Sequence, residues 1–160
     1  MREMTRIHAK AERIIDAEPE EVWAMLTDYT DTRARMLPES YLEYAVERAA
    51  DGVGATLTYR LRAGGRERAY RMDVEVATPG QLLIERDQTS SYTTRWQVER
   101  VGPGAHTRVR LYSEWESRAT GLSGIFERRF APMGIQRIHQ ETLVRLGRLA
   151  REREEALAHR

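Results

Sequence analysis

The sequence predicts an α+β domain in which a seven-stranded, curved antiparallel sheet packs around one long C-terminal helix. Three observations support this fold class. Apolar and charged residues alternate in one early segment and six later ones, which is typical of strands with one buried face. Two short helical segments follow the first strand, and helical spacing of apolar residues returns near the C-terminus. A length of 160 residues fits a single domain, residues 1–160.

The N-terminal elements are predicted from the alternation of apolar and charged residues and from the positions of two prolines. Residues 7–15 alternate between small apolar and charged side chains, which indicates a strand. Pro19 then stands in a first helical turn beside Glu20, whose carboxylate is favourable at the positive end of a helix. A second short helical segment lies within residues 28–37 and ends before Pro38, because the residue preceding a proline avoids the helical region.

Six further strands are predicted between residues 42 and 116, separated by turns rich in glycine, proline and aspartate. The segment 82–84 is apolar on both faces, so the alternation does not reveal which face is buried. In the other strands one face is apolar and the other charged, and the apolar face should lie against the helix. The aromatic side chains expected on that inner face are Tyr44, Tyr59, Tyr70, Tyr92, Trp96 and Trp115.

The C-terminal helix is predicted from about residue 122 onward, where apolar residues recur three or four positions apart. Pro132 removes a backbone donor, and glycines stand nearby, so a kink or break is expected between residues 131 and 134. Residues 151–160 are so highly charged that they are expected to protrude or fray.

Composition excludes several classes of function. The chain has 26 Lys and Arg against 25 Asp and Glu, interspersed, so no nucleic-acid partner is expected. It contains no Cys, which excludes disulfides, thiolate metal sites and cysteine nucleophiles. There is neither an apolar run long enough to span a membrane nor an apolar secretion signal, so a cytoplasmic location is expected. A homodimer remains an open possibility.

No catalytic, metal-binding or cofactor-binding motif is found. The four histidines lack metal-ligand spacing, and the sequence has neither a nucleophile elbow nor a phosphate-binding glycine loop. The carboxylates of Asp73 and Glu75 lie on the arginine-rich outer face, where cross-strand ion pairs explain them. Arg13 falls on the inner face, and Arg86 is a candidate for it. An ion pair at the rim of the sheet is the favoured role for both, and anchoring of an anionic ligand is the alternative.

A sheet that curls around one helix leaves a space between its concave face and the helix, and this space is the expected ligand site. Tyrosine and tryptophan bring polar tips to that buried surface, and such tips need hydrogen-bond partners. A packed core with hydroxyls bonded to the backbone is the alternative. The predicted ligand-contacting residues are Tyr44, Leu57, Tyr59, Tyr70, Met72, Tyr92, Thr94, Trp96, Ser113, Trp115, Phe126, Phe130 and Met133.

Four segments, taken in their order along the chain, resemble the SRPBCC or START-like superfamily, which is also called Bet v 1-like. Within it they resemble the polyketide cyclase/dehydrase-like branch. Residues 15–28 are similar to the opening strand and helix of that family, and the other segments are 51–55, 74–79 and 106–109. The resemblance covers residues 7–150 and implies a helix-grip fold. These are packing and turn motifs, so they do not indicate the chemistry.

Three functions remain open at this point. The preferred prediction is binding or transport of a small hydrophobic ligand such as a lipid, polyketide, isoprenoid or quinone-like molecule. The second is an enzyme similar to the aromatase/cyclases of the family, which would assist enolisation of a poly-β-keto chain through Tyr or Arg groups. The third is a protein-interaction module of the co-chaperone or ribosome-associated type. No catalytic residue is assigned, because no motif of those enzymes matches residue by residue.

Overall fold

The computed structural model describes residues 4–50 and 54–160, apart from the side chains of Ala50, Phe126, Arg129 and Phe130. Its α+β architecture confirms the predicted fold class. The elements, in chain order, are β1 (Thr5–Ile15), α1 (Pro19–Thr27), α2 (Thr32–Met36), β2 (Tyr41–Ala50), β3 (Gly54–Ala63), β4 (Arg66–Thr78), β5 (Leu82–Asp87), β6 (Thr93–Arg100), β7 (Thr107–Ser117) and α3 (Gly121–Ala158).

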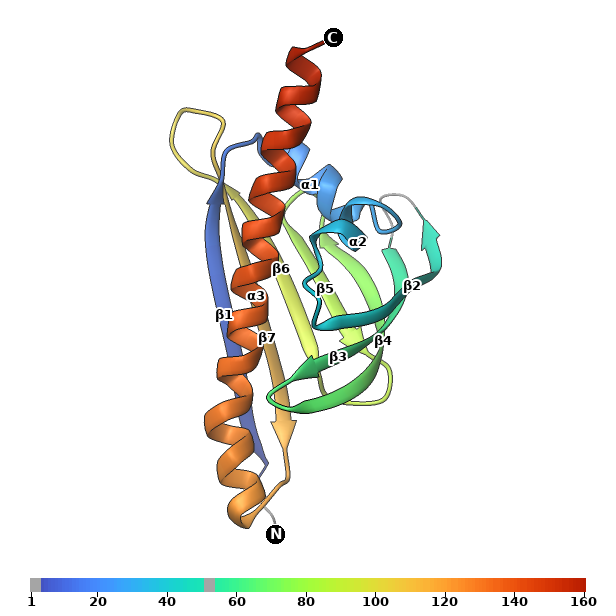
Figure 1. Cartoon of the computed structure of the whole chain (residues 1–160), viewed down its shortest axis with the longest axis vertical. Helices are drawn as coiled ribbons and strands as arrows, with labels where there is room; N and C mark the ends of the chain where they lie inside the picture. The colour runs from blue at the N-terminus through green and yellow to red at the C-terminus, as the bar shows by residue number, and fades with distance from the viewer. Residues whose placement is uncertain (1–3, 51–53) are drawn as a thin grey trace.

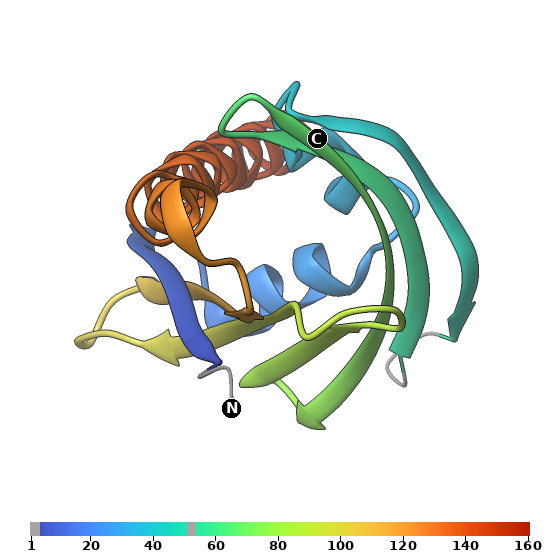
Figure 2. The same cartoon turned by 90° about the horizontal axis from the view of Figure 1, so that it is seen from below.

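The seven strands form one antiparallel sheet in the order β1-β7-β6-β5-β4-β3-β2. Strands β2 to β7 pair with their neighbours in sequence, whereas β1 pairs with β7. Figure 1 shows α3 running along the part of the sheet formed by β1 and β7. Figure 2 shows the sheet curving so that α1, α2 and α3 lie on its concave side. This arrangement is the helix-grip fold that the resemblance implied.

The main core lies between the concave face of the sheet and the helices. Strand β5 contributes Leu83, which is fully buried, together with Glu85 on the same face. The inner face of β5 is therefore settled, and Arg86 lies on the outer face, where its guanidinium is 2.6 Å from the Glu75 carboxylate. Arg13 shares the face of the buried Ala11 and Ile15, as expected, but it lies at the rim and is exposed. Its side chain lies against Gly147 of α3, where the missing Cβ leaves room for it at the protein surface.

Of the kink or break expected at residues 131–134, the break is wrong, because α3 continues through Pro132 without interruption. A Cβ atom at Gly134 would lie 3.3 Å from the backbone nitrogen of Gly64, so this glycine permits close approach of α3 to the β3–β4 turn. Packing there offsets the backbone hydrogen bond that the proline lacks. The cluster formed at this contact consists of Ala9, Leu61, Ile135 and Ile138.

The C-terminal end of α3 extends beyond the sheet (Figure 1). Residues 151–160, for which protrusion or fraying is expected, are all exposed, and the helix continues to Ala158. Among the described helices, none is both long and apolar enough to cross a membrane.

Strand β2 forms one edge of the sheet and pairs irregularly with β3. Its register shifts between Leu42 and Ala45 and again between Val46 and Arg48. Within the first irregularity, Glu43 has a φ of 54°, which is uncommon for a residue other than glycine. The edge strand is therefore bent and interrupted rather than regular.

Gly54, the first residue of β3, is expected to tolerate no side chain. Its φ is +152°, and a Cβ atom would lie 2.4 Å from the backbone oxygen of Val74. We expect Gly54→Ala to lower the free energy of unfolding by about 1–3 kcal/mol through backbone strain and this clash. Urea denaturation measures the effect. Gly102→Ala is the control, because Gly102 has a φ of +68° with no neighbouring atom within 4 Å. An equal loss in both variants would contradict a role for the Val74 contact.

Candidate ligand-binding site

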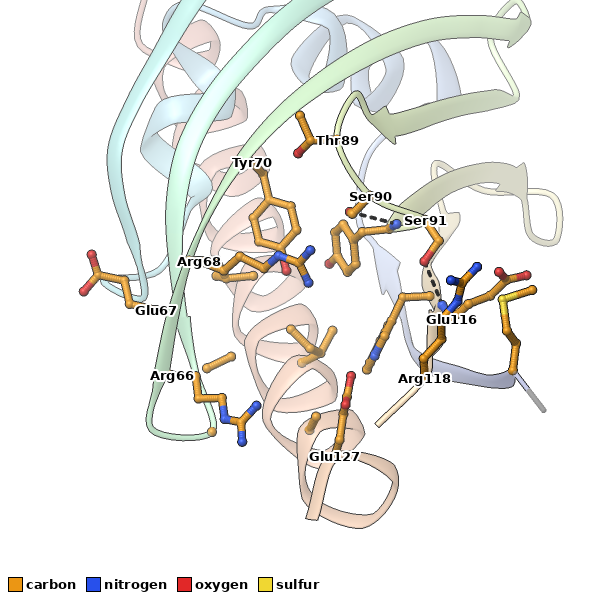
Figure 3. A pocket seen from close by; sticks show the side chains of 18 residues that line it. Arg66, Glu67, Arg68, Tyr70, Thr89, Ser90, Ser91, Glu116, Arg118 and Glu127 are labelled. Atoms are coloured by element: carbon orange, nitrogen blue, oxygen red, sulfur yellow. Dashed lines mark hydrogen bonds between the residues drawn. The ribbon is translucent and has the colours of Figure 1, made fainter. Parts of the chain in front are cut away.

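A cavity of about 750 Å³ lies between the concave face of the sheet and the N-terminal half of α3. This volume is within the range of about 300–1,000 Å³ that is typical of small-molecule sites. Its apolar wall comprises Leu61, Tyr70, Tyr92, Trp115 and Ile135. Its mouth is polar and is formed by the start of β4, the loop of residues 89–91, the end of β7 and the first turns of α3 (Figure 3). The site thus combines an apolar interior with a charged entrance.

Five aromatic rings form a continuous row across the concave face, which we call the aromatic belt. The distances between ring centroids are 5.0 Å for Tyr41–Tyr59, 5.7 Å for Tyr59–Tyr70, 4.8 Å for Tyr70–Tyr92 and 6.0 Å for Tyr92–Trp115. These distances are typical of favourable aromatic pairs. Three members, Tyr70, Tyr92 and Trp115, line the cavity directly. The belt therefore gives the cavity a wall of ring faces and edges.

The phenols of the belt are neutral at physiological pH. Burial raises the pKa of Tyr41, Tyr59, Tyr70 and Tyr92 above the ordinary value of a tyrosine. Within residues 4–50 and 54–160, no hydrogen bond reaches the hydroxyl of Tyr41 or Tyr59. These two hydroxyls therefore have unused hydrogen-bonding capacity, although neither residue lines the cavity.

A buried polar cluster stands behind Tyr92. The Ser113 hydroxyl lies 3.1 Å from the Tyr92 hydroxyl, 2.7 Å from that of Thr94 and 2.7 Å from Nε2 of His139. His139 belongs to α3 and is only 2% exposed, and burial lowers its pKa to about 3, so the imidazole is neutral. The cluster therefore fixes the Tyr92 hydroxyl at the cavity wall and ties β6, β7 and α3 together.

A buried ion pair closes the opposite end of the fold, where α2 meets the sheet. The Arg33 guanidinium binds both oxygens of Glu85, the longer contact being 3.0 Å, and it lies 4.6 Å from the centre of the Trp96 ring. Trp96 Nε1 donates to the Glu85 carboxylate at 3.2 Å. Nearby, the Tyr44 hydroxyl donates to the backbone oxygen of Tyr29 at 2.6 Å. Trp96 and Tyr44 are thus engaged in internal hydrogen bonds.

The structure separates the predicted ligand-contacting residues into groups. Tyr70, Tyr92 and Trp115 line the cavity. The remaining described candidates on the sheet pack into the core or form the polar clusters around it; they are Tyr44, Leu57, Tyr59, Met72, Thr94, Trp96 and Ser113. Met133 is 59% exposed and does not line the cavity, because its turn of α3 directs Ile135 inward instead. The predictions for Phe126 and Phe130 lie outside the described side chains.

Sequence reasoning missed most of the cavity lining, including Leu61, Arg68 and Ile135. Leu61 and Ile135 are apolar residues in predicted elements, and nothing in the pattern singles them out. The position of Arg68 could have been predicted. It lies two residues before Tyr70, so it is on the same face of that strand, nearer to its N-terminal end.

The remaining described histidines and acidic groups lie away from the cavity wall or have partners. His106 Nδ1 is 3.0 Å from the Asp16 carboxylate, and His8 stacks on Tyr112 of the outer face. Across the described segments, no group of three histidine or acidic side chains could hold a metal ion. The structural evidence for a site therefore rests on the cavity.

Comparison with known proteins gives matches over nearly the whole chain. The profile of a family described as polyketide cyclase/dehydrase and lipid transport matches residues 6–151. The solution structure of KanY protein has a TM-score of 0.79 and 33% identity, covering 92% of this chain and 99% of that one. The Zhui aromatase/cyclase from Streptomyces sp. R1128 has a TM-score of 0.68 and 13% identity, covering 93% and 96%. A START superfamily protein from Mycobacterium smegmatis has a TM-score of 0.61 and 16% identity, covering 94% and 98%. No curated protein sequence matches.

Proposed function

Because the chain belongs to the polyketide cyclase/dehydrase and lipid transport family, we propose that its cavity binds a small, mainly hydrophobic molecule that carries polar groups. The observation that supports this best is the aromatic belt, three of whose rings border a cavity of about 750 Å³. Lipids, polyketides, isoprenoids and quinone-like molecules fit this description.

The wall would supply both affinity and orientation. Removing apolar surface from water stabilises a complex by about 25 cal/mol per Å², and Leu61, Ile135 and the belt rings provide such surface. The neutral phenols would hydrogen-bond to carbonyl or hydroxyl groups without the cost of burying a charge. A ligand with polar groups at intervals along an apolar skeleton satisfies both requirements.

A cyclase-type reaction is the second candidate, and the polar cluster behind Tyr92 favours it. Ser113 holds the Tyr92 hydroxyl in a fixed position, and burial raises the pKa of that phenol. Tyr92 would therefore act as a hydrogen-bond donor that polarises a ligand carbonyl and so acidifies the adjacent C–H bond, and a base on the ligand or in solvent would take that proton. A Tyr92→Phe variant that binds a poly-β-keto compound normally but no longer accelerates its cyclisation would support this candidate, and unchanged turnover would contradict it.

Binding of the neutral fluorescent probe N-phenyl-1-naphthylamine tests the proposed function. We expect saturable fluorescence enhancement with the unmodified protein. We expect affinity weaker by about tenfold in Trp115→Ala and in Tyr92→Ala, since each change removes an aromatic wall. Circular dichroism establishes that both variants remain folded.

Tyr112→Ala is the matched control for this experiment. Tyr112 lies on the outer face of β7, where it stacks on His8. Probe affinity should be unchanged in this variant. Equal weakening by Tyr112→Ala and Trp115→Ala, or the absence of saturable binding, would refute the assignment of the cavity as the site; in the latter case a protein-interaction role would become the better explanation.

A further inference from the structure

Arg68 places a positive charge at the mouth of the cavity, on the inner face of β4, where its side chain is exposed. Alternation along this strand puts Arg68 on the same face as Tyr70 and Met72, and Met72 is fully buried in the core. Arg68 is paired across the sheet with Leu61, another residue of the cavity wall. Figure 3 shows the Arg68 side chain extending from β4 into the cavity beside the Tyr70 ring.

Arg68 differs from its neighbours in lacking an acidic partner. On the outer face, Arg60 lies 2.6 Å from Glu67, and Arg71 lies 2.7 Å from Glu47. By contrast, no carboxylate of the described residues lies within 4.0 Å of the Arg68 guanidinium. Its carbon Cζ is instead 5.6 Å from the centre of the Tyr70 ring, a cation–π contact that orients the group without neutralising it.

The acidic side chains that border the cavity are already engaged elsewhere. Glu67 binds Arg60 and also Arg62, on the outer face of the hairpin. Glu116 is 3.8 Å from Arg6. Glu127 accepts a hydrogen bond of 2.7 Å from the Ser117 hydroxyl. The charge of Arg68 therefore remains available to an anion that enters the cavity.

We propose that the cavity takes amphiphilic carboxylic acids, and that Arg68 binds the carboxylate while the apolar part of the ligand lies along the aromatic belt. A planar guanidinium matches a carboxylate through two parallel, charge-assisted hydrogen bonds, which fix the orientation of the acid at the cavity mouth. The proposal rests on the proposed function of the cavity and adds the chemical class of its ligand.

Displacement of bound N-phenyl-1-naphthylamine by dodecanoate and by 1-dodecanol tests the proposal, because these compounds share a chain and differ in head-group charge. At neutral pH and below micelle-forming concentrations, dodecanoate should displace the probe at an about tenfold lower concentration than dodecanol. In Arg68→Gln, dodecanoate should lose this advantage, while dodecanol and the probe itself should bind as in the unmodified protein.

Arg71→Gln provides the matched control, since Arg71 lies on the same strand but on the opposite face. It should retain the preference for dodecanoate. Equal displacement by both compounds in the unmodified protein, or a preference that survives Arg68→Gln, would overturn the role of Arg68 and leave the proposed binding function intact. Absence of saturable probe binding would instead refute the binding function itself.

Discussion

Replacing Glu85 with alanine is expected to lower the free energy of unfolding by about 3–5 kcal/mol, because it leaves a buried guanidinium without its counter-ion. Arg33 is only 4% exposed, and Glu85 is the one carboxylate that binds it among the described residues. The substitution also removes the acceptor of the Trp96 indole. Urea denaturation followed by tryptophan fluorescence at neutral pH measures the loss.

Two comparisons separate this effect from a general effect of charge. Arg86→Gln breaks the outer-face pair with Glu75, whose side chains are 53% and 60% exposed, and it should cost less than about 1 kcal/mol. The double variant Arg33→Met with Glu85→Met should recover much of the stability lost in Glu85→Ala, since it leaves no isolated charge. A loss in Glu85→Ala no larger than that in Arg86→Gln would contradict the structural role of the buried pair.

His139 is expected to make the protein progressively less stable as the pH falls from about 6.5 toward 3. Burial lowers the pKa of His139 in the folded state to about 3, from an ordinary value of 6.5. In this interval the unfolded chain binds a proton that the folded chain does not. The His139 contribution to stability is therefore complete above pH 6.5 and decreases by about 1.4 kcal/mol per pH unit below it.

Denaturation curves collected across this pH range isolate the contribution when they are compared with those of His139→Gln. This variant should show a shallower loss of stability in acid, because glutamine does not titrate. His8→Gln is the control, since His8 is exposed on the outer face of β1, and it should retain the slope of the unmodified protein. Parallel pH profiles for the unmodified protein and His139→Gln would show that the buried imidazole does not govern the acid response.

The sequence was sufficient to predict the strands and most of their faces, because burial on one side of a sheet enforces a strict alternation. Tyr92 and Trp96 are buried as the alternation requires, and Tyr112 lies on the outer face. Strand β5 could not be assigned in this way. Its outward Leu82 and Ile84 are apolar, and its inward Glu85 is charged, so the pattern gives no indication of the buried ion pair with Arg33.

The cavity residues were predictable only in part, because alternation gives the face of a strand but not the position along it where packing ends. Leu57 and Trp115 both belong to the inner face, yet only Trp115 borders the cavity. Helix α3 also shows what a pattern of residues cannot predict. Pro132 and Gly134 indicated an interruption of the helix. In the structure, the absence of a side chain at Gly134 instead lets α3 pack closely against Gly64.

The irregular pairing of β2 has a consequence for behaviour in concentrated solution. An outermost strand with a regular row of free amide and carbonyl groups can recruit a strand from another molecule and begin a growing polymer. The register shifts at Leu42–Ala45 and Val46–Arg48 interrupt that row, and charged side chains such as Glu43 and Glu47 lie along it. These irregularities therefore make the β2 edge a poor template for pairing with a strand of another molecule.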